Sequence, residues 1–212
     1  MPANRIHLVR HGEVHNPEGV LYGRIAHFHL SERGHLMAQA AADELKAQRR
    51  PVAAIFCSPL LRTRESAEPI RAAFNLDVKT DARLIEPTNV FEGRRLGVKH
   101  IILRPHLYFH LRNPQRPSWG EAFEAIADRM IEAITEIANQ TPEGDVVLVS
   151  HQLPIWMVHR RLAGLKLPHN PKQRRCALSS ITTLEFDKKG KLTEVEYCDP
   201  AAGIKSIDRG AV

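Results

Sequence analysis

The amino-acid sequence predicts an α/β fold with a mostly parallel sheet. Short apolar runs at residues 5–10, 52–57 and 145–150 are separated by longer segments in which apolar residues recur at helical spacing. Strand and helix patterns that alternate in this way are typical of a parallel sheet whose strands are joined by helices. The 212 residues, 43% of them hydrophobic, are enough for one well-buried core. We therefore expect a single domain that spans residues 1–212.

Composition narrows the class of protein. The chain has no apolar run long enough to cross a membrane and no signal-peptide core, so we expect a cytoplasmic protein that does not bind membranes. The net charge of +6 suits an anionic partner. Charge alone does not choose among a small phosphoester, nucleic acid and an acidic surface. Because the basic residues are scattered and only 6% of the residues are aromatic, we expect no nucleic-acid partner. The motifs described below favour a small phosphorylated metabolite. The oligomeric state stays open, and a homodimer is one alternative.

The first elements are a strand, a loop and a helix. Residues 5–10 end in an aliphatic pair and predict a strand that is buried on both faces. The loop at 12–30 contains proline and glycine, which is typical of surface segments that hold ligands. Ser31 then caps a helix that runs to about Gln48 and has Leu36 on its buried face.

A second strand and helix follow in the same order. Residues 52–57 are apolar. Ser58 and Pro59 after them predict a helix N-cap with proline at the first helical position. This helix continues to Phe74, and a short strand is expected at 78–80.

The middle of the chain is irregular. Prolines and glycines interrupt residues 87–117, so we expect a lid-like segment there, with a helical piece at 99–111. The segment is basic, which suits an anionic substrate. Ser118–Glu121 predicts a capping box, and a helix with an apolar stripe from Phe123 to Ile137 follows it.

The last part of the chain contains a strand, a helix and a hairpin. Residues 145–150 are nearly all aliphatic, and Pro154 is expected to open a helix that ends near Leu162. Residues 180–186 and 192–197 flank the turn sequence Asp-Lys-Lys-Gly, which predicts a β-hairpin.

Chemically active residues follow three of the predicted strands. The first strand ends in Arg10-His11, Arg62 lies just beyond the second, and His151 follows the strand at 145–150. Because the carboxyl ends of parallel strands face one crevice, these side chains are expected to converge. A neutral His11 is a nucleophile, Arg10 supplies a fixed charged fork, and Gly12 lets a ligand approach the backbone. With two helix N-termini nearby, the sequence predicts a phosphate site.

These motifs together resemble those of the histidine phosphatase superfamily, which includes cofactor-dependent phosphoglycerate mutases and many small phosphatases. The resemblance implies a three-layer α/β/α sandwich with a mostly parallel mixed sheet. This chain departs from the family pattern at Val14, where members often have threonine, at Asn16, which comes one residue early, and at Gln152, which replaces a glycine. The segments that carry the resemblance are Leu8–Glu13, Leu30–Gly34, Ser58–Thr63, Arg83–Glu86, Phe91–Gly93 and Ser150–His151.

The resemblance also implies a reaction and a set of site residues. His11 would attack phosphorus and form a phosphohistidine that water then hydrolyses. Glu86 would protonate the leaving oxygen and later activate the water. Arg10, Arg62 and a protonated His151 would neutralise the phosphoryl oxygens. The further substrate-binding residues implied are Asn16, Tyr22, Gly23 and Gln152.

The expected activity is therefore hydrolysis of a small anionic phosphomonoester without a metal or a cofactor. A mutase and a non-catalytic phosphate-binding protein are the alternatives, although the second commonly lacks the nucleophile or the acid. The spacing of His11 and His15 fits a zinc motif, but glycine and proline oppose a helix there. Cys57 and Arg62 suggest a cysteine phosphatase, but lie one residue closer together than in that class. Glu92 is the reserve candidate for the acid.

Overall fold

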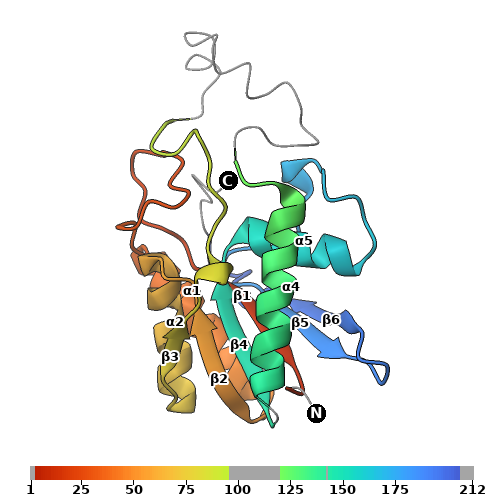
Figure 1. The fold of residues 1–212 in the computed structure, drawn as a ribbon. Coiled ribbons are helices and arrows are strands. Elements are labelled where there is room, and N and C mark those ends of the chain that lie inside the picture. Colours follow the sequence, from red (N-terminus) through yellow and green to blue (C-terminus); the bar gives the residue numbers. More distant parts are fainter. Residues whose placement is uncertain (1–2, 96–119, 142, 206–212) are drawn as a thin grey trace.

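The computed structural model describes residues 3–95, 120–141 and 143–205, and its strands form one mixed sheet (Figure 1). The order of strands in this sheet is β3-β2-β4-β1-β5-β6. The strands are β1 (Ile6–Arg10), β2 (Val52–Cys57), β3 (Val78–Thr80), β4 (Asp145–Ser150), β5 (Ile181–Phe186) and β6 (Leu192–Cys198). The α-helices are α1 (Glu32–Ala47), α2 (Leu61–Phe74), α4 (Phe123–Gln140) and α5 (Gln152–Leu162), and short 3-10 helices lie at Ala82–Leu84 and Pro171–Gln173.

The sheet is mostly parallel, as the sequence predicts. β1 pairs with β4 in parallel, and β4, β2 and β3 continue the parallel part. β5 then runs antiparallel to β1, and β6 runs antiparallel to β5. The predicted hairpin therefore supplies the antiparallel edge of a mixed sheet.

Helices cover both faces of the sheet, which gives the three-layer α/β/α sandwich. On one face, Leu8 and Leu148 pack in a core cluster with residues of α4 and α5, such as Ile134. On the other face, Val9 and Val149 pack with residues of α1 and α2. Successive strand residues point to opposite faces, so apolar residues on both faces of the central strands are buried under helices. Every residue of β1 and of β4 is buried.

The first helix is confirmed at its start, but its buried face differs from the prediction by one residue. The Ser31 hydroxyl accepts a hydrogen bond from the Gly34 amide, which is the expected cap. Leu36 is 61% exposed, and Met37 is buried instead. Half of the buried positions of α1 are alanines, so the apolar stripe is poorly marked in the sequence.

Two other helix starts also differ from the prediction. α2 begins at Leu61 with Leu60 as its N-cap, so Ser58 does not cap it. α4 begins at Phe123, which leaves Glu121 outside the helix, and the capping box prediction is wrong. In both cases the polar side chain is bonded elsewhere, as described below.

Two more expectations concern helices. α5 begins at Gln152, two residues before the predicted Pro154, and proline is tolerated there because amides of a first helical turn need no intrahelical acceptor. Most of the lid-like segment at 87–117, with its helical piece at 99–111, lies outside the described residues.

No helix in the part of the chain that the structure describes is long and apolar enough to cross a membrane.

Candidate active site

The carboxyl ends of three neighbouring strands bring the predicted residues together. His11 follows β1, His151 follows β4, and Ser58 follows β2. The amide of His11 donates to the carbonyl of Ser150 at 3.1 Å, and the amide of Ser58 donates to the carbonyl of Val149 at 3.0 Å. The rings of His11 and His151 lie 5.2 Å apart between centroids. The sheet itself therefore sets the distance between the two histidines.

His11 is held as a neutral ring with one nitrogen available. Its Nδ1 lies 2.8 Å from the carbonyl oxygen of Gly12. Because a carbonyl oxygen only accepts, Nδ1 must carry the proton, and Nε2 keeps its lone pair. Burial and the charges of Arg62 and Arg10 lower the pKa of His11 well below its ordinary value of 6.5. Nε2 is thus a nucleophile at neutral pH.

Arg10 and Arg62 are almost completely buried, at 1% and 0% exposure. Backbone carbonyls orient both guanidinium groups. Arg10 donates from Nη1 to the carbonyl of Cys176 at 2.7 Å, and Arg62 donates from Nη2 to the carbonyl of Gly23 at 2.5 Å. Nε of Arg62 has no hydrogen-bond partner among residues 3–95, 120–141 and 143–205. Buried cations are costly unless an anion compensates them, so this arrangement favours an anionic ligand.

His151 lies between Ser58 and Glu86. Its Nε2 is 2.9 Å from Oγ of Ser58, and its Nδ1 is 3.5 Å from Oε2 of Glu86. Burial, followed by the charge of Arg62, lowers the pKa of His151 well below 6.5. The ring is therefore neutral at pH 7, whereas the resemblance implies a protonated ring. The bond to His151 also explains why the Ser58 hydroxyl does not cap α2.

Glu86 is a buried carboxyl whose proton affinity suits acid–base chemistry. Desolvation raises its pKa to about 7, although Arg62 and three other arginines act in the opposite sense. Its Oε1 has no hydrogen-bond partner in the described part of the chain. Glu92 has other partners, since its Oε1 accepts hydrogen bonds from the amides of Arg24 and Asn89 at 3.0 and 3.1 Å. Glu92 thus binds the loop backbone, and Glu86 is the carboxyl beside the histidines.

Two of the predicted substrate-binding residues, Tyr22 and Gly23, contact Arg62. The Tyr22 ring meets the His11 ring edge-on at 6.2 Å, and the Arg62 guanidinium lies over the same tyrosine at 4.7 Å. Gly23 supplies the carbonyl that Arg62 binds, and its φ of 38° is one that glycine adopts readily. Both residues therefore position Arg62.

Gln152 and Asn16 make contacts within the protein. Gln152 is the first residue of α5, and its Nε2 donates to the Cys176 carbonyl at 3.4 Å, the same oxygen that Arg10 binds. The Asn16 side chain closes its own loop, because its Nδ2 donates to the carbonyl of Val20 at 2.8 Å. Gln152 is thus joined to the arginine site, whereas Asn16 binds the loop backbone.

Gly12 has a packing role that the sequence did not suggest. A Cβ at this position would overlap the backbone of Gly34 in α1, so the missing side chain allows the loop and the helix to pack closely. The Gly12 amide donates to Oγ of Ser66 at 3.1 Å. The glycine therefore serves packing beside the nucleophile.

Sequence reasoning missed Arg174, which lies on the segment before β5. Its Nη1 donates to Oε1 of Gln152 at 3.2 Å, and its Nε donates to Nε2 of His169 at 2.9 Å. Its charge is among those that lower the pKa of Glu86. The basic run at 172–175 is visible in the sequence, but no periodicity shows that it folds over the start of α5.

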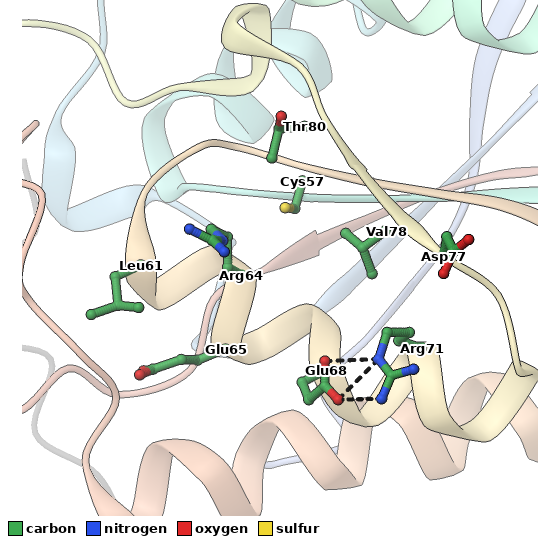
Figure 2. Close-up of a pocket in the computed structure, with 9 residues that line it drawn as sticks. All are labelled: Cys57, Leu61, Arg64, Glu65, Glu68, Arg71, Asp77, Val78 and Thr80. Atoms are coloured by element: carbon green, nitrogen blue, oxygen red, sulfur yellow. Dashed lines mark hydrogen bonds and ion pairs between the residues drawn. The ribbon is translucent and has the colours of Figure 1, made fainter.

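Two alternatives that the sequence left open find little support in the geometry. Cys57 lines a pocket of about 800 Å³ between α2 and β3, and none of the residues labelled there is one of the converging histidines or arginines (Figure 2). Burial raises the pKa of Cys57 to about 11, so its thiol is a poor nucleophile at neutral pH. The ring of His15 stacks on that of His29 at 5.1 Å. Among the described residues, no group of three or more potential ligands is arranged to hold a metal ion.

Comparisons with known proteins identify relatives along most of the chain. An uncharacterized protein of Mycobacterium tuberculosis is 47% identical over 199 residues, which are 93% of this chain and 97% of that protein. A 2,3-bisphosphoglycerate-dependent phosphoglycerate mutase of Thermoplasma acidophilum is 34% identical over 151 residues, or 70% of each chain. Phosphoserine phosphatase 1 of Hydrogenobacter thermophilus is 30% identical over 164 residues, or 76% of each chain.

A solved structure and a family model give the same assignment as these relatives. The solved structure of YhfR from Bacillus stearothermophilus is similar with a TM-score of 0.77 and 26% identity, and the match covers 91% of this chain and 96% of that one. The sequence model of the histidine phosphatase superfamily (branch 1) matches residues 6–198. Its members include phosphatases and mutases, which all transfer phosphoryl groups. The chain therefore belongs to the histidine phosphatase superfamily.

Proposed function

We propose that this protein is a phosphatase that hydrolyses small anionic phosphomonoesters through a phosphohistidine at His11. One observation carries the proposal: a neutral histidine with Nε2 available faces the same site as a carboxyl whose pKa is about 7. A nucleophile and a general acid are the two groups that such a reaction requires.

In the first half-reaction, Nε2 of His11 attacks phosphorus in line. The P–N bond forms as the bond from phosphorus to the leaving oxygen breaks. Glu86 gives its proton to the leaving oxygen, and the product is an alcohol. Arg10 and Arg62 neutralise the equatorial oxygens, which is the role that a metal ion has in other phosphatases. This division of labour supports a metal-independent reaction.

In the second half-reaction, water attacks the phosphohistidine. The Glu86 carboxylate, now without its proton, takes a proton from the water as the P–O bond forms. The P–N bond breaks, and His11 returns to its neutral form with the lone pair on Nε2. Inorganic phosphate leaves, and Glu86 has regained its proton.

Binding of the substrate is expected to change the protonation of His151. The arginine charges that lower its pKa are the charges that a phosphoryl dianion compensates. His151 is then free to take up a proton and to donate from Nδ1 to a phosphoryl oxygen. The Ser58 hydroxyl suits both states of the ring, because a hydroxyl both donates and accepts.

A third arginine supports a substrate with a second negative group. Arg174 is held at the start of α5 by Gln152 and His169, and its charge acts on Glu86. A phosphoryl dianion offsets the two charges of Arg10 and Arg62, so Arg174 favours a further anionic group on the substrate. The relatives named for phosphoglycerate and phosphoserine have substrates of this chemical kind.

The mutase is the second candidate, because one relative carries that name. A panel of phosphorylated metabolites, scored for both phosphate release and isomer formation, separates the two. We expect phosphate release that is lost in His11→Ala and kept in His15→Ala, a matched change of an exposed histidine in the same loop. Isomerisation without release would contradict the phosphatase proposal, and full activity of His11→Ala would contradict the nucleophile.

A further inference from the structure

Glu121 lies just before α4, and its side chain joins two segments that surround the site. Its carboxylate binds Arg129 with two hydrogen bonds, from Nε to Oε1 at 2.8 Å and from Nη2 to Oε2 at 3.0 Å. Nη2 of Arg24 also reaches Oε2, at 3.3 Å. A two-point bond to a carboxylate fixes the plane of a guanidinium group.

Both of these arginines also donate hydrogen bonds to backbone carbonyls of the segment that carries Glu86. Arg129 donates from Nη1 to the carbonyl of Arg83, at the first residue of that segment. Arg24 donates from Nε to the carbonyl of Glu86 itself, at 2.6 Å. The two ends of the segment 83–86 are therefore held by side chains that Glu121 orients.

We propose that Glu121 is a positioning residue for Glu86, because it orients the two arginines that hold the backbone at Arg83 and Glu86. This inference rests on the proposed role of Glu86 as general acid. For acid catalysis, the Glu86 carboxyl must be placed correctly relative to the leaving oxygen and to His151. A misplacement of about 1 Å in such a group lowers a rate substantially.

The same contacts have an electrostatic consequence. The Glu121 carboxylate offsets the positive charges of Arg24 and Arg129, and Arg129 is one of the groups that lower the pKa of Glu86. Without that carboxylate, more of the Arg129 charge acts on Glu86, and the pKa of Glu86 falls. Among the residues that the structure describes, the charged or titratable groups around Glu86 are Arg10, Arg24, Arg62, Arg129, His151 and Arg174.

The test compares Glu121→Gln with Glu124→Gln, a control in the first turn of α4 whose side chain is 71% exposed and pairs with Arg161. Single-turnover phosphorylation is measured with an alkyl phosphate, which needs a general acid, and with nitrophenyl phosphate, which hardly does. We expect Glu121→Gln to slow the alkyl reaction about 10-fold and to leave the nitrophenyl reaction nearly unchanged. The control should match the wild type on both substrates.

The pH profile supplies a readout that a purely structural role would not give. The alkaline limb of the alkyl reaction should move to lower pH in Glu121→Gln, because the acid then loses its proton more readily. In Arg129→Gln the limb should move to higher pH, because a positive charge near Glu86 is removed. Both variants should slow the alkyl reaction.

The outcomes separate this inference from the proposed function. Glu86→Gln reports on the acid itself: if it shows no selective loss, the proposed role of Glu86 fails, and the inference fails with it. If Glu86→Gln is selective and Glu121→Gln is unchanged, or equally slow on both substrates, only the inference is overturned. Thermal denaturation shows whether Glu121→Gln folds. If it does not fold, Arg24→Gln is tested in its place. A selective loss on the alkyl substrate would then support the inference, and no selective loss would overturn it.

Discussion

The substitution Glu86→Gln tests the acid and isolates its contribution. Glutamine has the size of a protonated glutamate but gives up no proton. An alkoxide is a poor leaving group and needs that proton in the transition state, a contribution of about 10² to 10⁴ in rate. We therefore expect a loss of that size for an alkyl phosphate. Nitrophenolate leaves without a proton, so phosphoryl transfer from nitrophenyl phosphate to His11 should be slowed far less.

The pH dependence follows from the environment of the carboxyl. Burial raises the pKa of Glu86 to about 7. About half of the molecules then carry the proton at pH 7 and about one in ten at pH 8. With the enzyme below saturation, where the rate reports the unliganded site, the alkyl reaction should therefore fall about fivefold between these values. In Glu86→Gln the slow remaining reaction should lose this alkaline limb, because the group that titrates is absent.

The assay must observe the first half-reaction alone, because Glu86 also activates water in the second. Single-turnover rates with excess enzyme meet this condition. Glu92→Gln is the matched control, since that carboxylate binds the amides of Arg24 and Asn89. This variant should change the single-turnover rates with the two substrates by the same factor. Equal losses on both substrates in Glu86→Gln, or a selective loss in Glu92→Gln, would refute the assignment of Glu86 as the acid.

Three further predictions concern stability and substrate choice. Burial raises the pKa of Asp145, but hydrogen bonds from His7 and Arg50 outweigh it and hold the pKa at about 2 against an ordinary 3.8. This difference amounts to about 2 kcal/mol of stability that is present above pH 4 and lost as the pH falls towards 2. Asp145→Asn should therefore lower the free energy of urea unfolding at pH 7 and flatten its acid dependence, and a pH dependence like that of the wild type would contradict this. Gly12→Ala should destabilise the fold by about 1 to 3 kcal/mol, because its Cβ meets backbone atoms of α1; thermal unfolding no different from that of the wild type would exclude this clash. Arg174→Gln should raise KM for a phosphomonoester with a carboxylate far more than for one without, and parallel changes would remove the proposed second anionic subsite.

Much of the fold could be predicted because the central strands are buried on both faces. Val147 and Val149 face one layer of helices and Leu148 faces the other, so residues 146–149 of β4 are all aliphatic. Such runs, separated by helical patterns, indicate a parallel sheet. Ligands bind at the carboxyl ends of parallel strands, and this rule is enough to predict that His11 and His151 converge.

The errors have a common cause in competition for polar side chains. Ser58 and Glu121 stand where helix caps are expected, but the first binds His151 and the second binds Arg129. Which partner a side chain selects depends on contacts between residues far apart in the sequence. Arg174 escaped notice for the same reason, since its partners Gln152 and His169 are contacts of the folded chain. Local sequence patterns therefore do not predict such pairings.

The phosphoenzyme tests the central claim most directly. Rapid quench after mixing the enzyme with labelled nitrophenyl phosphate should trap a covalent phosphoryl adduct that is labile in acid and stable in base. Mass spectrometry should map the adduct to His11. The adduct should accumulate in Glu86→Gln because water is no longer activated. It should form in His15→Ala as in the wild type and should not form in His11→Ala. Turnover without a phosphoenzyme, or a label on any residue other than His11, would contradict the mechanism.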